Sequence, residues 1–256
     1  MSLPARSFPP FRGRVWGRVR VFDVIRKTTY WSALDDPNIS RRISDSKSGT
    51  NDGLKHIQDA WTFLQLKDAQ SLKILEIGGG VSRILPVLDP SNERWNLDEF
   101  IGEGNGVSKP VELPGVKLVQ SKMGNFSDEL PDNYFDFAFS ISVIEHVPND
   151  FLPRFWEDHA RVLKHGGRAV HTIDFYLGDE RNGLVERRLN MYLEGPRKFG
   201  LRLESPSALS RPAVFTSDMA SNSDWAMWRR NKIAPKLADV RATKQSVSLA
   251  AIFRKR

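Results

Sequence analysis

The chain of 256 residues contains no cysteine. This excludes a disulfide framework, a thiolate zinc or iron–sulfur site and a cysteine nucleophile. It also lacks an apolar run of the ~20 residues that a membrane-spanning helix needs. Arginines interrupt the N-terminal region, which therefore does not have the apolar stretch of a secretory signal. With 40% hydrophobic residues the chain can form one sizeable core. We expect a soluble, cytoplasmic protein.

Acidic residues are scarce at both ends of the chain. Residues 1–50 hold ten Lys/Arg against four Asp/Glu, and residues 225–256 hold nine against one, whereas residues 51–224 hold 19 against 26. A protein that coats nucleic acid usually spreads its basic charge over its folded surface. Here the basic charge lies at the two ends of the chain, so the function of the acidic centre has to be inferred from its own motifs. Residues 223–232 interleave tryptophan with arginine. Ordinary packing is favoured for this segment over a carbohydrate or small-molecule pocket or a nucleic-acid contact.

Short apolar runs alternate with helical stretches along most of the chain. Helical periodicity predicts helices over 54–66 and 151–163, the latter stopped by Gly166-Gly167, and a helical patch over 184–193. Apolar runs predict strands at 72–77, 95–98, 116–120, 134–140, 168–173 and 247–253. Strands separated by helix-length segments favour an α/β fold, a doubly wound sheet with helices on both faces. We expect a basic N-terminal extension over residues 1–50 and one domain over 51–256.

The sharpest local pattern is a strand that ends in three glycines, Gly78-Gly79-Gly80, ahead of an expected helix. Glycines at this position let a ligand approach the backbone where a β-carbon would clash. Arg83 stands where the dinucleotide fingerprint has its third glycine, which disfavours a nicotinamide or flavin cofactor. Glu76 lies inside the apolar strand, where a carboxylate needs hydrogen-bond donors. It could accept from the turn amides and help hold a cationic amino-acid group. A tight turn without a ligand is the alternative.

These residues resemble motif I of the class I S-adenosylmethionine-dependent methyltransferases (methyltransferase type 11-like), and the resemblance continues in order over about residues 71–175. Asp98 lies 20 residues after Gly78, where the family places an acid that binds the ribose. Further segments that resemble family motifs are Met123-Gly124 at the adenine position, Phe135–Val147 and Arg161–Arg168. The resemblance implies a doubly wound Rossmann-like sheet, mostly parallel with an antiparallel last strand, and S-adenosylmethionine as cofactor.

The resemblance implies a set of cofactor-binding residues at the ends of the strands. Lys122-Met123 stands where the family often has an acid that binds the adenine, so the adenine contacts would come from the backbone. Glu99 is adjacent to Asp98, and a register shift of one residue would exchange their roles. The expected cofactor contacts are Glu76, Gly78, Gly79, Gly80, Asp98, Met123, Gly124, Ser140 and Ile141.

Glu145 and His146 follow the fourth predicted strand, in the turn that faces cofactor and substrate in this fold. His146, with an ordinary pKa of ~6.5, is a candidate general base, and Glu145 accompanies it as a catalytic candidate. The alternative is that the pair only caps a turn. Some relatives carry Glu-x-x-Glu-His here and bind a divalent ion, but Ser142 replaces the first glutamate, so we expect no metal site. A metal would need further ligands such as His171 or Asp174.

Fewer residues indicate where the methyl acceptor would bind. Asp174 and Tyr176, at the end of the fifth predicted strand, are candidate substrate contacts, and residues 178–240 are expected to cover the substrate. The first hypothesis is methyl transfer to an O or N atom of a small or medium acceptor, such as a saccharide precursor, a lipid or another metabolite. Alternatives are an RNA methyltransferase that uses the basic flanks, and a noncatalytic cofactor-binding scaffold. Nucleic acid is the less favoured partner, a peripheral membrane contact of the N-terminal arginines is an option, and the oligomeric state is not predicted.

Overall fold

The fold is that of a computed structural model, which describes residues 22–25, 37, 54–102, 107–177, 183–204 and 245–256. Its helices are α3 (Leu54–Leu66), α4 (Leu152–Val162) and α5 (Gly183–Glu194), with short 3-10 turns η1 (Leu85–Val87), η2 (Ile144–His146) and η3 (Pro196–Phe199). Its strands are β1 (Phe22–Val24), β2 (Lys73–Ile77), β3 (Glu93–Asp98), β4 (Val116–Gln120), β5 (Phe135–Ile141), β6 (Leu163–Leu177), β7 (Leu201–Leu203) and β8 (Gln245–Lys255).

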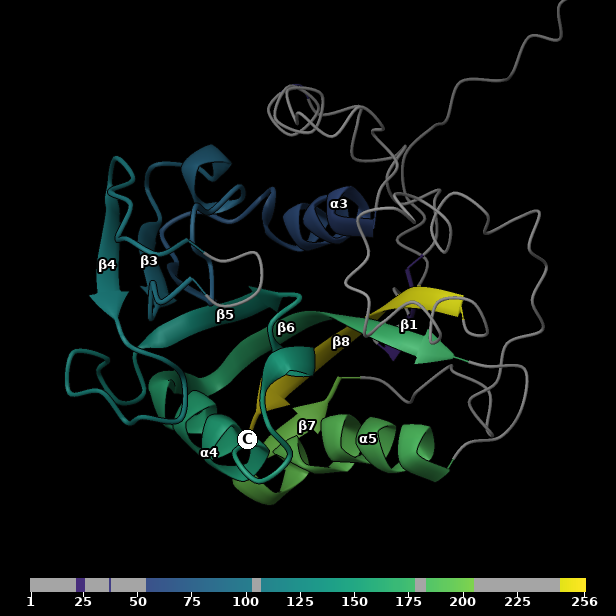
Figure 1. The fold of residues 1–256 in the computed structure, drawn as a ribbon. Coiled ribbons are helices and arrows are strands. Elements are labelled where there is room, and N and C mark those ends of the chain that lie inside the picture. The colour runs from purple at the N-terminus through teal and green to yellow at the C-terminus, as the bar shows by residue number, and fades with distance from the viewer. Residues whose placement is uncertain (1–21, 26–36, 38–53, 103–106, 178–182, 205–244) are drawn as a thin grey trace, which may run out of the picture.

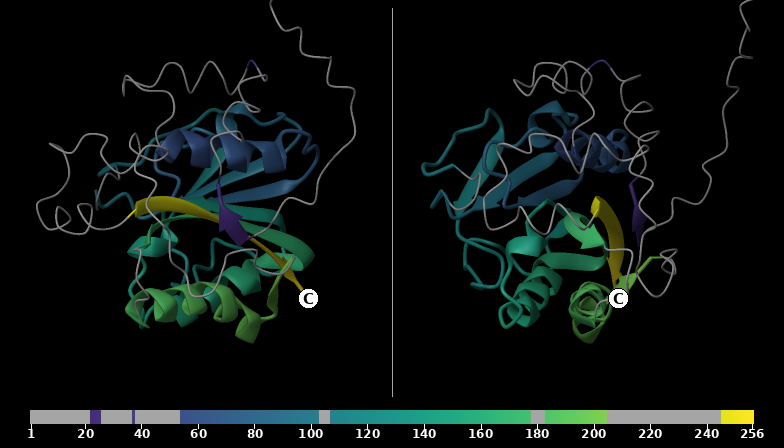
Figure 2. Two further views of the ribbon diagram at one scale, coloured as in Figure 1. Left: turned by 90° about the vertical axis from the view of Figure 1, so that its right-hand side faces the viewer. Right: turned by 45° about the vertical axis from the view of Figure 1, so that its right-hand side comes forward.

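One sheet runs through the described part of the chain in the order β1-β8-β6-β5-β2-β3-β4, and β7 also pairs with β8. Strands β2 to β6 are parallel, and β8 is antiparallel to β6. The prediction of a mostly parallel α/β sheet with an antiparallel last strand is therefore confirmed. β1 and β7 share the outer edge of β8, since β1 pairs with Leu249–Ala251 and β7 with Phe253–Lys255 (Figure 2).

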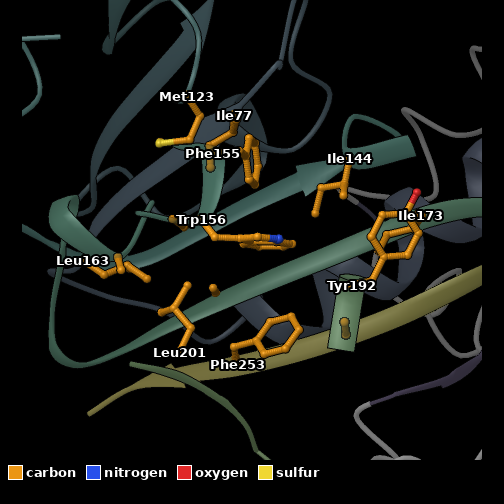
Figure 3. Packing of buried hydrophobic residues seen from close by; sticks show 14 of the residues in the cluster. Ile77, Met123, Ile144, Phe155, Trp156, Leu163, Ile173, Tyr192, Leu201 and Phe253 are labelled. Atoms are coloured by element: carbon orange, nitrogen blue, oxygen red, sulfur yellow. The ribbon is translucent and has the colours of Figure 1, made fainter. Parts of the chain in front are cut away.

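The two faces of the sheet carry separate apolar clusters. α3 covers one face, where Ile57 and Trp61 pack with Phe137 and Val170. α4 and α5 cover the other face (Figure 1). There Trp156 packs among strand and helix residues close to Met123, Phe155 and Phe253 (Figure 3). Because side chains alternate along a strand, each strand supplies one set of residues to each cluster.

Two predicted features differ from the structure. The glycine turn leads into η1, a single 3-10 turn that contains Pro86, rather than into an α-helix. Gly166 and Gly167 lie inside β6 and do not end a helix, since α4 already stops at Val162. The backbone explains this, because Gly166 has φ +80° and a Cβ on Gly167 would lie 2.9 Å from the Lys164 carbonyl oxygen. The glycines thus allow an irregular start of β6, where its pairing with β5 shifts register.

The regions expected at the two margins of the domain are only partly described. Residues 22–25 come from the basic N-terminal region yet belong to the sheet, where Ile25 joins the α3-side core. Within the expected substrate cover, residues 201–203 form β7 at the amino ends of the parallel strands, away from the glycine turn, so this part does not cover the site. The Trp/Arg segment 223–232 lies outside the described residues. No helix in the described ranges is both long and apolar enough to cross a membrane.

Candidate cofactor and acceptor site

The glycine turn lies at the carboxyl ends of the parallel strands, the edge where doubly wound sheets bind ligands. Gly78 and Gly80 have φ values of +66° and +50°, a region that residues with a Cβ rarely adopt. A Cβ on Gly78 would lie 2.6 Å from Cγ2 of Val143, so the turn packs against the segment after β5. At Gly80 an added Cβ would meet nothing closer than 3.6 Å. An added Cβ at Gly80 would only make ordinary van der Waals contacts with Val107 and Asp98, so the positive φ rather than crowding favours glycine there.

Two side chains of β3 hold the peptide groups of Gly80. The Gly80 N–H donates to Oδ2 of Asp98 (2.9 Å), and Nδ2 of Asn96 donates to the Gly80 carbonyl oxygen (2.9 Å). Gly79 packs on Asn96 and Glu76, since an added Cβ would collide with Oδ1 of Asn96 and would lie 2.8 Å from the Glu76 carboxyl carbon. Asn96 was not among the predicted site residues. Its signal is the spacing of two residues from Asp98, which places both side chains on the same face of β3.

Glu76 lies beneath the same turn and is almost completely buried. Burial raises the pKa of Glu76 to about 8, although a hydrogen bond with Ser82 lowers it. Its Oε2 is buried without a hydrogen-bond partner among the residues that the structure describes. A cationic group would supply the missing partner and favour the charged carboxylate. The glycine turn, Glu76 and Asp98 thus fit a ligand that carries an amino-acid end and a ribose.

The side chains of Asp98 and Glu99 diverge. Asp98 accepts from the Gly80 N–H and, at Oδ1, from the Phe100 N–H (2.8 Å). Glu99 instead forms an ion pair with Lys122 (3.3 Å) at the end of the neighbouring strand. Asp98 is therefore the acid that faces the glycine turn.

The loop expected at the adenine is held from α4. The side chain of Met123 is buried in the α4-side core (Figure 3), so this residue can offer mainly its backbone to a ligand. The N–H groups of Gly124 and Phe126 both donate to Oδ2 of Asp158, at 2.7 Å and 3.0 Å. Gly124 has φ +101°, and an added Cβ would lie 2.6 Å from the Phe151 ring. The buried Asp158 carboxylate, which sequence reasoning missed, fixes this loop.

On the acceptor side, η2 brings Glu145 against the end of β6. Oε1 of Glu145 accepts from the backbone N–H of Asp174 (3.3 Å), while its Oε2 is buried and finds no partner in the described part of the chain. Burial raises the pKa of Glu145, and the nearby Asp174 carboxylate raises it further. Arg188 holds the η2 backbone, donating to the carbonyl oxygens of Ile144 (3.1 Å) and Val147 (2.8 Å). The structure thus brings together two of the predicted residues, Glu145 and Asp174.

A polar network from α3, absent from the predictions, orients Asp174. Nε2 of Gln58 donates to Oδ1 of Asp174 (2.6 Å) and to Ser248 (2.8 Å), and its Oε1 accepts from Ser142 (2.7 Å). Lys55 pairs with the other oxygen of Asp174 at 3.2 Å. Gln58 is fully buried, whereas 26% of the Asp174 side chain is exposed. Asp174 is therefore fixed in orientation yet partly open to a ligand.

Three of the other predicted residues lie apart from this pair. His146 is exposed on η2. His171 is fully buried on the face covered by α4, where it contacts Ser140 at 2.8 Å and its pKa is lowered by burial and by His159. Since side chains alternate along β6, His171 and Asp174 point to opposite faces, and His171 is not placed to share a ligand with Asp174. The side chain of Ser140 is likewise directed to that core.

Ile141 and Tyr176 are half-buried near the strand ends. Ile141 packs against the α3-side core, and Tyr176 pairs with Ser246 of β8. In the described part of the chain no three His, Asp or Glu side chains are grouped so as to hold a metal ion.

A comparison with known families identifies the kind of domain that contains this site. Residues 75–171, from the middle of β2 through His171, match the methyltransferase domain family. The chain carries a class I S-adenosylmethionine-dependent methyltransferase domain. Its cofactor is S-adenosylmethionine. The donors and acceptors at Glu76, the glycine turn and Asp98 are of the kinds that the amino-acid end and the ribose of that molecule would need. A comparison with curated protein sequences finds no match.

Solved structures support the same fold at low sequence identity. Geranyl diphosphate C-methyltransferase from Streptomyces coelicolor A3(2), in complex with Mg2+, geranyl diphosphate and S-adenosyl-L-homocysteine, is 12% identical with a TM-score of 0.51, and 92% of each chain is covered. Phosphoethanolamine N-methyltransferase 2 from Haemonchus contortus, in complex with S-adenosyl-L-methionine, is 12% identical with a TM-score of 0.50 over 88% of this chain and 60% of that one. These similarities concern the fold of the methyltransferase domain.

Proposed function

We propose that the domain methylates an oxygen or nitrogen atom of a small or medium acceptor, a saccharide precursor, lipid or other metabolite, which binds over Glu145 and Asp174. The observation that carries this proposal is the buried, unpartnered Oε2 of Glu145 beside the partly exposed Asp174. An acceptor O–H or N–H would give Glu145 the donor that it lacks, because a buried acceptor without a partner is costly. Two carboxyl groups also suit an acceptor that presents more than one donor.

The turn that carries Glu145 lies beside the glycine turn, where the cofactor is expected to bind. Val143, two residues earlier, packs on Gly78 at the glycine turn. When bound there, S-adenosylmethionine supplies an electrophilic methyl group. The contribution of the chain is then to hold the acceptor in line and to accept its proton. The raised pKa of Glu145, about 8, makes its carboxylate a stronger base than an exposed glutamate, and the ionised fraction that can accept a proton grows as pH rises toward that value.

His146 is the second candidate base, and the two can be separated by experiment. With a radiolabelled methyl donor, pools of metabolites, glycans, lipids and RNA are screened for label uptake, and the best acceptor is used with Glu145→Gln, Asp174→Asn and His146→Ala variants. If Glu145 takes the proton, Glu145→Gln should lower kcat by about 100-fold or more and remove the ionisation seen in the pH profile. Asp174→Asn should mainly raise KM.

The matched control is His146→Ala, which should keep kcat within a fewfold of the unaltered protein. Loss of activity in His146→Ala with Glu145→Gln still active would assign the base to His146. Label uptake by RNA alone would overturn the small-acceptor proposal.

A further inference from the structure

Three arginines stand side by side across β6, β8 and β7, at the end of the sheet opposite the glycine turn. Arg168 pairs in register with Arg254, and Arg254 pairs with Arg202. Directly opposite residues of antiparallel strands share a face, with Cβ atoms about 5 Å apart. These three residues, the arginine row, therefore direct their guanidinium groups to one face.

The charge of the row is only partly balanced. Glu204 accepts from Arg168 (2.9 Å) and from Nε of Arg254 (3.1 Å), so one carboxylate serves two guanidinium groups. Nε of Arg168 is buried without a partner. Arg202 is exposed and forms no ion pair within the part of the chain that the structure describes. Three cations against one anion leave a net charge of about +2 on a narrow strip, and like charges directly opposite each other are destabilising.

The position of the row separates it from the catalytic edge. Arg168 and Asp174 lie six residues apart on β6, which corresponds to about 20 Å of extended strand. A small acceptor that reacts near Asp174 could not reach the row. The arginine row therefore lies outside the proposed acceptor site.

The chemistry of the row fits phosphate. Guanidinium groups bind phosphate oxygens through paired hydrogen bonds and are less strongly hydrated than ammonium groups. Residues 51–224 of the sequence are net acidic, with 19 Lys/Arg against 26 Asp/Glu. A long nucleic-acid strand would also meet this acidic block. In the described residues, the large apolar side chains that are exposed are Val81, Ile101 and Leu184, none of them aromatic, so a base-stacking platform is missing there.

We propose that the arginine row docks the protein on the phosphate headgroups of an anionic lipid surface, with the catalytic edge directed away from it. A short strip of cations favours such a surface because each basic residue near an anionic membrane adds a small, additive attraction. This inference does not depend on the proposed acceptor.

Co-sedimentation with lipid vesicles tests the proposal on the full chain. Vesicles of phosphatidylcholine with phosphatidylserine are compared with phosphatidylcholine alone, and mixed RNA is tested in parallel by filter binding. Arg202→Gln is the decisive variant, because Arg202 has no ion pair to lose, and Arg187→Gln on α5 is the control with the same change of charge. We expect binding to the anionic vesicles only, weakened about fivefold by Arg202→Gln and unchanged by Arg187→Gln.

Cofactor affinity, measured alongside, should be the same in both variants, which shows that folding is intact. Absence of binding to anionic vesicles, or equal losses in the two variants, would overturn the proposal. Submicromolar binding to RNA that Arg202→Gln abolishes would also overturn it and assign the row to nucleic acid.

Discussion

Replacement of Glu76 by glutamine should stabilise the protein in the absence of cofactor. The pKa of this buried carboxyl is about 8 in the folded protein, against an ordinary value of 4.5. Near pH 7 the unfolded chain carries an ionised Glu76, while the folded chain carries a protonated one. Folding must then take up a proton against a difference of ~2.5 pH units, which costs roughly 3 kcal/mol at ~1.4 kcal/mol per unit.

The sign of the pH dependence follows from the raised pKa. The contribution of the protonated Glu76 is fully present below about pH 4.5 and is lost as pH rises toward about 8. Glutamine keeps the size and the hydrogen bonds of the protonated group but does not ionise. Its advantage should therefore grow from pH 5 to pH 8, to a melting temperature roughly 5–10 °C higher in the cofactor-free protein.

Thermal melts of the two proteins at several pH values measure this effect, with Glu99→Gln as the control on the neighbouring, more exposed carboxyl. A difference in melting temperature that does not vary with pH would refute the reasoning. In the unaltered protein, S-adenosylmethionine should favour the ionised Glu76, since its ammonium group supplies the missing partner of Oε2. Calorimetry near pH 7 in two buffers of different ionisation enthalpy should then detect proton release that Glu76→Gln abolishes.

Two further predictions concern the adenine loop and metal ions. Asp158→Asn should lower the free energy of unfolding by about 2 kcal/mol and weaken cofactor binding severalfold, because the buried carboxylate accepts from the N–H groups of both Gly124 and Phe126. Denaturant melts and cofactor titration measure these two quantities. Unchanged values would contradict this role of Asp158. Turnover should survive exhaustive chelation, because Ser142 replaces the first carboxylate of the metal-binding pattern; activity that is lost and then restored by magnesium, manganese or zinc would show the opposite.

Local sequence patterns were sufficient to predict most of the fold. The helical spacing of Ile57, Trp61 and Leu64 predicted α3 with its observed bounds, and the apolar run Tyr134–Ser140 predicted a buried strand, observed as β5. The start of β6 was predicted incorrectly, because two consecutive glycines such as Gly166-Gly167 are also a common signal for the end of a helix. Only the crowding of a Cβ by the Lys164 and Phe135 carbonyl oxygens reveals the irregular strand.

The site was predictable where a motif is continuous in sequence and missed where it depends on tertiary contacts. Glu76, Gly80 and Asp98 follow from spacing along two strands. Gln58, in contrast, reaches Asp174 from a helix 116 residues earlier in the chain, and no local pattern indicates that contact.

Calorimetric titration with S-adenosylmethionine tests the central claim, a cofactor pocket formed by the glycine turn and Asp98, most directly. The unaltered protein and the Glu99→Ala control should bind the cofactor at one site. Asp98→Ala should bind roughly 10- to 100-fold more weakly, because the proposed hydrogen bonds to the ribose hydroxyls and the support of Gly80 would be lost. No binding by the unaltered protein, or equal affinity of folded Asp98→Ala and Glu99→Ala, would contradict it.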